Sequence, residues 1–179
     1  MQKQLTTERL LIRPIIAEDH PHIFAGLSHP EVIKYYGVSY QTLEETQSQM
    51  DWYQSLVSEQ KGLWWAMIDK ADQSFLGALG LNDWDQQNRK AEFGLWLLPQ
   101  YWGQGYIQEA TPAIFKYAFA EMNLHRIEAF VESENQASQK ALQRLGFRHE
   151  GCMREAEIKN GRFISIEIFA FFEAEFPNT

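Results

Sequence analysis

Two glycines between a run of apolar residues and a helical pattern constrain this chain more than any other feature. The segment "PQYWGQGYIQEA" (99–110) follows the strand-like run "KAEFGLWLL" (90–98) and precedes a helical pattern that extends to Met122. Glycine loses more backbone entropy on folding than other residues, so two of them need a local reason. A tight turn is one reason, and close approach of the backbone to a ligand is the other.

The ligand that suits such a turn is an anion. The first amides of a helix lack partners within the helix, and together they carry a partial positive charge that favours phosphate. A G-x-G-x-x-G dinucleotide fingerprint would need a third glycine, and a G-K-[ST] phosphate loop is absent. The segment by itself leaves two readings open, a phosphate-binding turn and a turn without a ligand.

Length and charge narrow the class of protein. The chain has 179 residues, 45% of them hydrophobic, which fits a single domain spanning 1–179. The net charge of −8 disfavours nucleic acid as the main partner, and no apolar run reaches the roughly 18 residues of a membrane span. The single cysteine, Cys152, excludes an intrachain disulfide, and we expect it to pack within a sheet. With no signal-peptide pattern at the N-terminus, these features predict a cytoplasmic protein without a membrane partner.

The hydrophobic periodicity predicts a mixed order of strands and helices. Within helix 42–60, we expect Leu43, Met50, Tyr53 and Val57 to form the buried stripe. Asn135 is a suitable N-cap and Gly146 a suitable C-terminal cap for helix 135–147. The Asn160–Gly161 pair predicts a hairpin turn. The predicted strands are 8–15, 62–69, 74–84, 90–98, 126–132 and the two arms of the hairpin 151–171, and the predicted helices are 17–36 (broken at Pro30), 42–60, 106–122 and 135–147.

Three motifs in this order resemble the GNAT superfamily of acyl-CoA N-acyltransferases, and most closely its ribosomal-protein N-terminal (alanine or serine) acetyltransferases. They are "TERLLIRPI", "AEFGLWLLPQYWGQGYIQEA" and "NLHRIEAFVESENQASQKALQRLGFRHEG". The resemblance implies a single N-acetyltransferase domain over 1–179. Its fold would be a three-layer α+β fold, with a mixed, mostly antiparallel twisted sheet and helices on both faces. It also implies that acetyl-CoA is the cosubstrate and that the acceptor is a primary amine. The branch that the sequence resembles most closely acetylates the N-terminal α-amine of a ribosomal protein.

The resemblance also implies where acetyl-CoA binds. The amides of 103–107 would hold the pyrophosphate, in a loop that the family writes Q/R-x-x-G-x-G/A. Two frames fit this loop: Gln100-x-x-Gly103-x-Gly105 matches literally, whereas the frame we prefer, Trp102-x-x-Gly105-Tyr106-Ile107, has Trp for Gln or Arg and Ile for the last small residue. The backbone of 96–98 would pair with pantetheine, and Asn135 would contact the cofactor as well as cap its helix. Lys140, Arg144 and Arg148 form a basic island that either contacts CoA phosphate or is a solvated helix face. The expected cofactor-binding residues are Trp96, Leu97, Leu98, Gly103, Gln104, Gly105, Tyr106, Ile107, Asn135 and Lys140.

Amide formation requires a neutral amine and a proton for the departing thiolate. Neutralising an α-amine at pH 7 costs about 1 kcal/mol and neutralising a lysine nearly 5 kcal/mol, so an α-amine needs only modest help. Glu157 matches the base suggested for the resembled branch, and Glu92 is a second candidate. Leu142 replaces the tyrosine acid of many relatives, which leaves Ser138 as the proton source. The structural alternatives are a surface or ion-paired glutamate in each case, and a serine bonded back to a helix carbonyl.

Other functions remain open from the sequence. The acceptor could be a polyamine, an amino acid or an antibiotic, and a non-catalytic acyl-CoA-binding sensor is a different class. Free-thiol release from acetyl-CoA with and without amines separates these classes. His20 and His22 stand two residues apart without a third ligand nearby, so we expect no metal. Members of the resembled branch are often dimers, so a homodimer stays open alongside a monomer.

Overall fold

The computed structural model describes residues 3–177, and their strands form one eight-stranded sheet in the order β1-β2-β3-β4-β5-β6-β8-β7. Every neighbouring pair is antiparallel except β5 and β6, which are parallel. The predicted mixed, mostly antiparallel sheet is therefore confirmed. The strands are β1 Leu5–Thr6, β2 Leu10–Pro14, β3 Leu63–Asp69, β4 Phe75–Asp85, β5 Lys90–Leu97, β6 Arg126–Glu132, β7 Arg148–Lys159 and β8 Arg162–Phe172.

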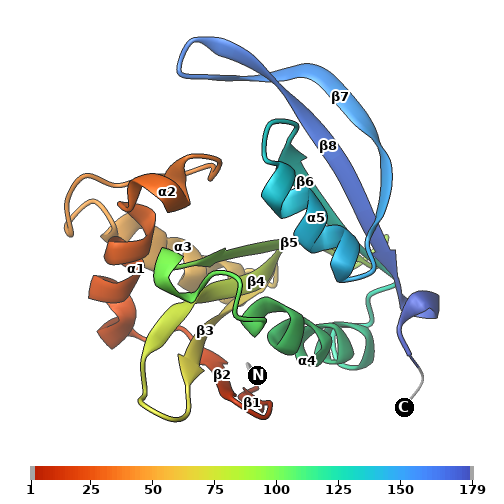
Figure 1. The fold of residues 1–179 in the computed structure, drawn as a ribbon. Coiled ribbons are helices and arrows are strands. Elements are labelled where there is room, and N and C mark those ends of the chain that lie inside the picture. Colours follow the sequence, from red (N-terminus) through yellow and green to blue (C-terminus); the bar gives the residue numbers. More distant parts are fainter. Residues whose placement is uncertain (1–2, 178–179) are drawn as a thin grey trace.

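Helices cover both faces of this sheet (Figure 1). The first three helices pack on one face, and α4 packs on the other. The long β7–β8 hairpin projects from the body beyond α5. The helices are α1 His20–Leu27, α2 Pro30–Ile33, α3 Gln47–Ser58, α4 Tyr106–Ala120 and α5 Gln136–Arg144, with short 3₁₀ turns at Ala17–Asp19, Pro99–Tyr101 and Glu173–Glu175.

The central strand β3 shows why two hydrophobic cores form. Successive side chains of a strand point to opposite faces, and nearly all of β3 is buried. Trp64 and Ala66 join the core beneath α1–α3, whereas Trp65 and Met67 join the core beneath α4. A near-continuous apolar strand of this kind is typical of a sheet covered on both faces.

Local turn and cap signals agree with the structure. Asn160 and Gly161 have φ of 50° and 75°, the left-handed conformation that a tight hairpin turn requires. The side chain of Asn135 accepts a hydrogen bond from Ser138 N–H at 3.1 Å and so caps α5. Gly146 has φ of 94°, as expected after the C-terminus of that helix.

Two details of the prediction are wrong. Leu43 and Val57 are each 41% exposed, because α3 begins only at Gln47 and turns its buried stripe toward Met50, Tyr53 and Leu56. Cys152 is exposed rather than packed within the sheet, since β7 is the outermost strand and belongs to the projecting hairpin.

Candidate active site

The strands β5 and β6 diverge soon after they begin. Their parallel pairing covers only Lys90–Glu92 opposite Arg126–Glu128. Beyond this point β5 continues to pair with β4, and β6 continues to pair with β8. The divergence, called the fork below, leaves one edge of β5 (93–97) and one edge of β6 (129–132) without a neighbouring strand.

The alternation of backbone groups determines what β5 presents to the fork. Leu98 N–H donates to Leu76 O of β4 at 2.9 Å. Since alternate residues of an antiparallel strand direct their backbone groups to the same side, Trp96 also points to β4. Leu95 and Leu97 therefore direct their backbone groups into the fork, and Leu97 O accepts from Trp102 Nε1 at 2.9 Å. Of the three residues expected to pair with pantetheine, Leu97 alone has this orientation.

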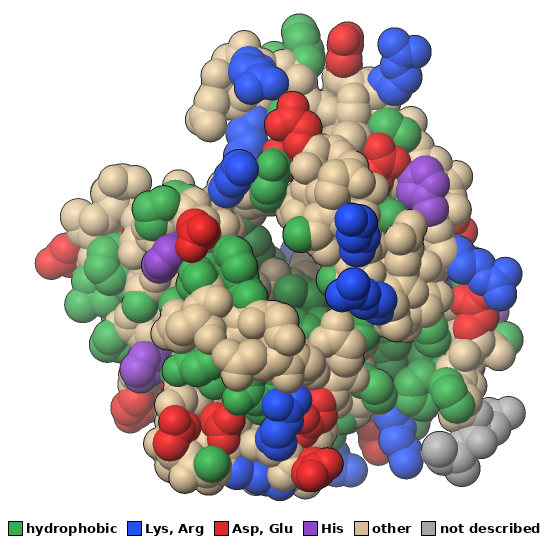
Figure 2. Space-filling view, in the orientation of Figure 1, with side chains coloured by type: hydrophobic (Ala, Val, Ile, Leu, Met, Phe, Trp, Pro, Cys, Tyr) green, Lys and Arg blue, Asp and Glu red, His purple; other side chains and the backbone are tan. Residues whose placement is uncertain are grey.

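One cavity of about 1210 Å³ passes through the fork. It runs from the loop after α2, past β5 and β6, to the N-terminal ends of α4 and α5. Figure 2 shows a central hollow between the lobe of α1–α3 and the side that carries α5, with basic side chains along its α5 rim. The predicted site residues that line this cavity are Glu92, Trp96, Leu97, Gly103, Gly105, Tyr106, Ile107, Asn135 and Ser138, and those that do not are Leu98, Gln104, Lys140 and Glu157.

The glycine turn (103–105) meets the cavity at the start of α4. Gly103 has φ of 72° and Gly105, the N-cap of α4, has φ of 80°, so both adopt the left-handed conformation that glycine favours. Within the described part of the chain, the amides of 103–107 have no hydrogen-bond acceptor. Five consecutive free amides at a helix N-terminus form a site suited to phosphate.

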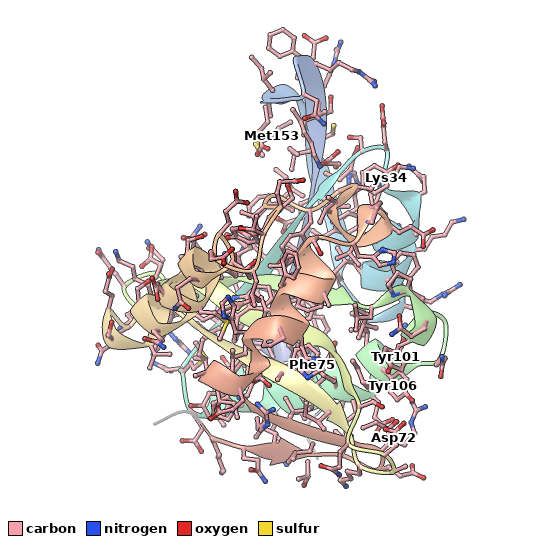
Figure 3. All side chains as sticks on the ribbon, turned by 90° about the vertical axis from the view of Figure 1, so that its left-hand side faces the viewer. Lys34, Asp72, Phe75, Tyr101, Tyr106 and Met153 are labelled. Carbon is pink, nitrogen blue, oxygen red and sulfur yellow. The ribbon has the colours of Figure 1, made fainter. Side chains whose placement is uncertain are left out.

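Arg9 holds this turn in place. Its guanidinium donates to Gln104 O at 3.1 Å and to Glu109 Oε2 at 2.6 Å, and it lies 4.3 Å from the centre of the Tyr106 ring. The Tyr106 hydroxyl in turn donates to Asp69 Oδ2 at 2.8 Å. Figure 3 shows Tyr106 beside Tyr101, near the β3–β4 loop that carries Asp72. The sequence contained no signal for Arg9, because its contacts lie about 100 residues away.

Helix α5 supplies the opposite wall. Ser138 lies on the cavity face, and its hydroxyl makes no hydrogen bond to any described residue, so the bond back to a helix carbonyl is not formed. Arg144 also lines the cavity, whereas Lys140 is exposed and lies outside it. The helical period explains the difference, because Lys140 lies about 200° around the helix from Ser138. Within the basic island, the structure therefore brings Arg144 to the cavity.

Glu92 stands where the fork opens, opposite Asn82 of β4 and Glu128 of β6. Burial raises its pKa to about 7, and the negative charges of Asp83 and Glu128 act in the same direction. A hydrogen bond with Asn82 opposes the effect. No described Lys or Arg pairs with Glu92, which leaves it a carboxyl group able to accept a proton near neutral pH.

Glu157 occupies a different environment. It is exposed on β7 of the projecting hairpin, beyond a register shift that follows Met153. The structure therefore brings Glu92 and Ser138 to one cavity and leaves Glu157 outside it. Of the aromatic side chains in the N-terminal half, Tyr35, Tyr36, Tyr40, Trp52 and Trp64 line the cavity beneath α1–α3.

Residues 3–177 hold neither a cluster suited to a metal ion nor a membrane-spanning helix. They contain no group of three His, Cys, Asp or Glu side chains arranged to hold a metal ion. None of their helices is both long enough and apolar enough to cross a membrane.

Comparison with known proteins identifies the class. Residues 9–148 match the acetyltransferase (GNAT) domain family. The chain is 32% identical over 158 residues to the uncharacterized N-acetyltransferase YoaA of Bacillus subtilis, which covers 88% of this chain and 89% of the relative. The chain belongs to the GNAT acetyltransferase family and is an N-acetyltransferase.

Two solved structures share the fold at lower identity. A spermidine N-acetyltransferase from Vibrio cholerae in complex with CoA and spermine aligns with a TM-score of 0.84 and 22% identity, covering 95% of this chain and 99% of that one. RimL, a ribosomal L7/L12 α-N-protein acetyltransferase in complex with CoA, aligns with a TM-score of 0.86 and 20% identity, covering 97% and 99%. These likenesses confirm the predicted α+β fold and come from proteins with different acceptors.

The raised pKa of Glu92 has a consequence for stability. The folded protein binds this proton more tightly than the unfolded chain, whose glutamate has a pKa of 4.5. Folding stability therefore falls as the pH rises from about 4.5 to about 7. Glu92→Gln should remove this loss and make the variant more stable than the wild type by about 2–3 kcal/mol at pH 8, at 1.36 kcal/mol per pKa unit and with an allowance for partial exposure.

Urea unfolding of both proteins at pH 5 and pH 8 measures this difference. The difference in the free energy of unfolding between variant and wild type should increase with pH. A gap of the same size at both pH values would show that Glu92 titrates in its ordinary range.

Proposed function

We propose that this chain transfers an acetyl group from acetyl-CoA to an N-terminal α-amine of a peptide or protein, with Glu92 as the general base. One observation carries the proposal. A set of free helix-start amides and a carboxyl group with a pKa near 7 meet in the same cavity, at the two ends of a fork that exposes strand backbone. The first suits the pyrophosphate of CoA, and the second suits removal of a proton from an amine.

The CoA end of the cavity follows from the same geometry. The glycine turn would hold the pyrophosphate, and Arg144 would face a CoA phosphate. The backbone groups of Leu95 and Leu97 point into the fork, where they would pair with pantetheine amides. A backbone N–H there would also stabilise the oxyanion, a contribution of about 3–4 kcal/mol in acyl transfer. Both solved neighbours named above hold CoA, which supports acetyl-CoA as the cosubstrate here.

The chemistry can then be assigned to residues. Glu92 accepts a proton from the amine, whose nitrogen attacks the thioester carbonyl. The carbon–sulfur bond breaks as the oxyanion collapses, and the CoA thiolate leaves. Ser138 is the side chain placed to return a proton to that sulfur, directly or through water, and a thiol of pKa about 8.5 needs little help.

The acidity of Glu92 favours an α-amine over a lysine. A base with a pKa of about 7 lies within about one unit of an α-amine at 7.7–8.0, so the proton transfer is nearly balanced. Transfer from a lysine at about 10.4 would be uphill by more than three units, or more than about 4 kcal/mol.

Competition between acceptors tests this function. Free-thiol release from acetyl-CoA should be faster with peptides beginning with Ser or Ala than with spermidine or with a lysine whose α-amine is blocked. A preference for spermidine would contradict the assignment of an α-amine as the acceptor, but it would still support acetyltransferase activity. Absence of amine-dependent release with every acceptor would instead support a non-catalytic sensor.

The role of Glu92 can be measured by its pH profile. Glu92→Gln should lower kcat/KM about 100-fold at pH 7, the lower end of the range for a general base. The loss should shrink at pH 9, where the α-amine is already neutral. Glu157→Gln, which changes the candidate outside the cavity, is the matched comparison and should lose much less. A larger loss in Glu157→Gln than in Glu92→Gln would reverse the assignment.

The glycine turn can be tested by binding. Gly105→Val places a branched side chain at a left-handed position beside the free amides, so acetyl-CoA affinity should fall tenfold or more. Gly151→Val, at an open position on the hairpin whose φ is not left-handed, is the control. Calorimetry on the folded variants measures their affinity for acetyl-CoA. An unchanged affinity in Gly105→Val would refute the pyrophosphate site.

A further inference from the structure

A single lysine ties the tip of the projecting hairpin to the body. Lys159 is the last residue of β7, directly before the Asn160–Gly161 turn. Its side chain is 27% exposed, whereas Ile158 and Phe163 beside it are 68% and 65% exposed. The tip thus leaves its apolar side chains in water and directs its lysine inward.

The Lys159 ammonium meets three acceptors. It donates to Lys34 O at 2.9 Å, to Tyr36 O at 3.4 Å and to the Glu132 carboxylate. An ammonium group has three N–H donors, so its capacity is filled. Both partners of the ion pair are largely shielded from water, and such a pair is tolerated when hydrogen bonds compensate for the lost hydration.

These acceptors belong to opposite walls of the cavity. Lys34 and Tyr36 begin the acceptor loop (34–40), most of which lines the cavity beneath α1–α3. Glu132 lies at the end of β6, the other arm of the fork, and also lines the cavity. Figure 3 shows Lys34 on the side of α2 that faces the hairpin bearing Met153. Lys159 therefore links the two walls.

Other restraints on the acceptor loop come from the side of α1 and α3: Tyr36 and Tyr40 pack against the core beneath α1–α3, and the Tyr40 hydroxyl donates to Gln49 Oε1 at 2.9 Å. The helix that leads into it, α2, has four residues, too few for a helix to be stable by itself. Of the loop's backbone hydrogen bonds, Tyr36 N–H to Ile33 O is a local bond to the end of α2, whereas Tyr40 N–H to Leu27 O reaches back to α1. The position of the loop thus depends on contacts from outside, and Lys159 supplies two hydrogen bonds to it.

We propose that Lys159 is a positioning residue that holds the acceptor loop against the cavity and thereby sets the affinity for the amine. This rests on the proposed function, since the loop would form the acceptor wall. Lys159 lies outside residues 9–148, the part of the chain that matches the acetyltransferase family. Loss of the link should weaken amine binding and leave the CoA end and the chemical step unaltered.

Steady-state kinetics of Lys159→Met test the proposal, because methionine keeps the length of the side chain and removes its charge. We expect the KM for the amine to rise about tenfold, kcat to stay within about twofold, and the Kd for acetyl-CoA to be unchanged, the pattern of lost ground-state binding. Lys159→Arg should show a smaller rise because it retains the charge. Arg154→Met, which removes an exposed charge from the same strand without a described ion pair, is the control.

Hydrogen exchange gives a readout that does not need turnover. The amides of Tyr36 and Tyr40 should exchange faster in Lys159→Met than in the wild type or in Arg154→Met. An unchanged amine KM, an equal change in acetyl-CoA affinity, or unchanged exchange in 34–40 would each overturn the positioning role. If the wild type acetylated no amine, the proposed function would fail, and the exchange measurement would still decide whether Lys159 holds the loop.

Discussion

The early end of the pairing between β5 and β6 is the constraint on which the rest of the site depends. A sheet normally satisfies the backbone groups of neighbouring strands along their whole length. Here the parallel pairing stops at Glu92 and Glu128, while each strand stays fully paired on its other side. The fold can keep this opening because β4 and β8 hold the two arms rigidly. The exposed edges then offer hydrogen bonds to a ligand in place of a strand.

The protein has a net charge of −8, yet positively polarised and positively charged groups gather around the cavity. A polyanionic cosubstrate would be repelled by the average surface, so attraction has to come from dipoles and a few cations near the cavity. Five free amides at the start of α4 supply it without any charged side chain in the turn itself. Arg9 supports these amides from behind through Gln104 and Glu109, and Arg144 stands on the opposite wall.

Features set by neighbours in sequence were predictable, and features set by distant contacts were not. The glycine turn, the Asn135 cap and the Asn160–Gly161 turn depend on local conformation, and the structure has each of them. The buried stripe of α3 differs from the prediction at Leu43, because the start of a helix without a side-chain N-cap bond is poorly marked, and at Val57, because the neighbouring Leu56 faces the core instead. Lys140 and Arg144 are both basic residues of α5. Only their positions around the helix axis decide that Arg144 lines the cavity and Lys140 does not. The contacts of Arg9 and Lys159 span about 100 and 125 residues, which no periodicity could reveal.

The same opening that frees the backbone also creates the unusual carboxyl group. Glu92 is the last β5 residue paired with β6, so its side chain leaves the sheet where the cavity begins and where Asp83 and Glu128 already stand. Its charge is poorly hydrated there, and the fold accepts the loss of stability that builds up between about pH 4.5 and pH 7. Further along β5, Leu95 and Leu97 direct their backbone groups into the fork, on the side where CoA is proposed to bind. In the proposed mechanism, a single strand would thus bring a proton acceptor and an oxyanion donor within a few residues of each other, facing two different substrates. That proximity is what an acyl transfer between a thioester and an amine requires, and it follows from ending one strand pairing early.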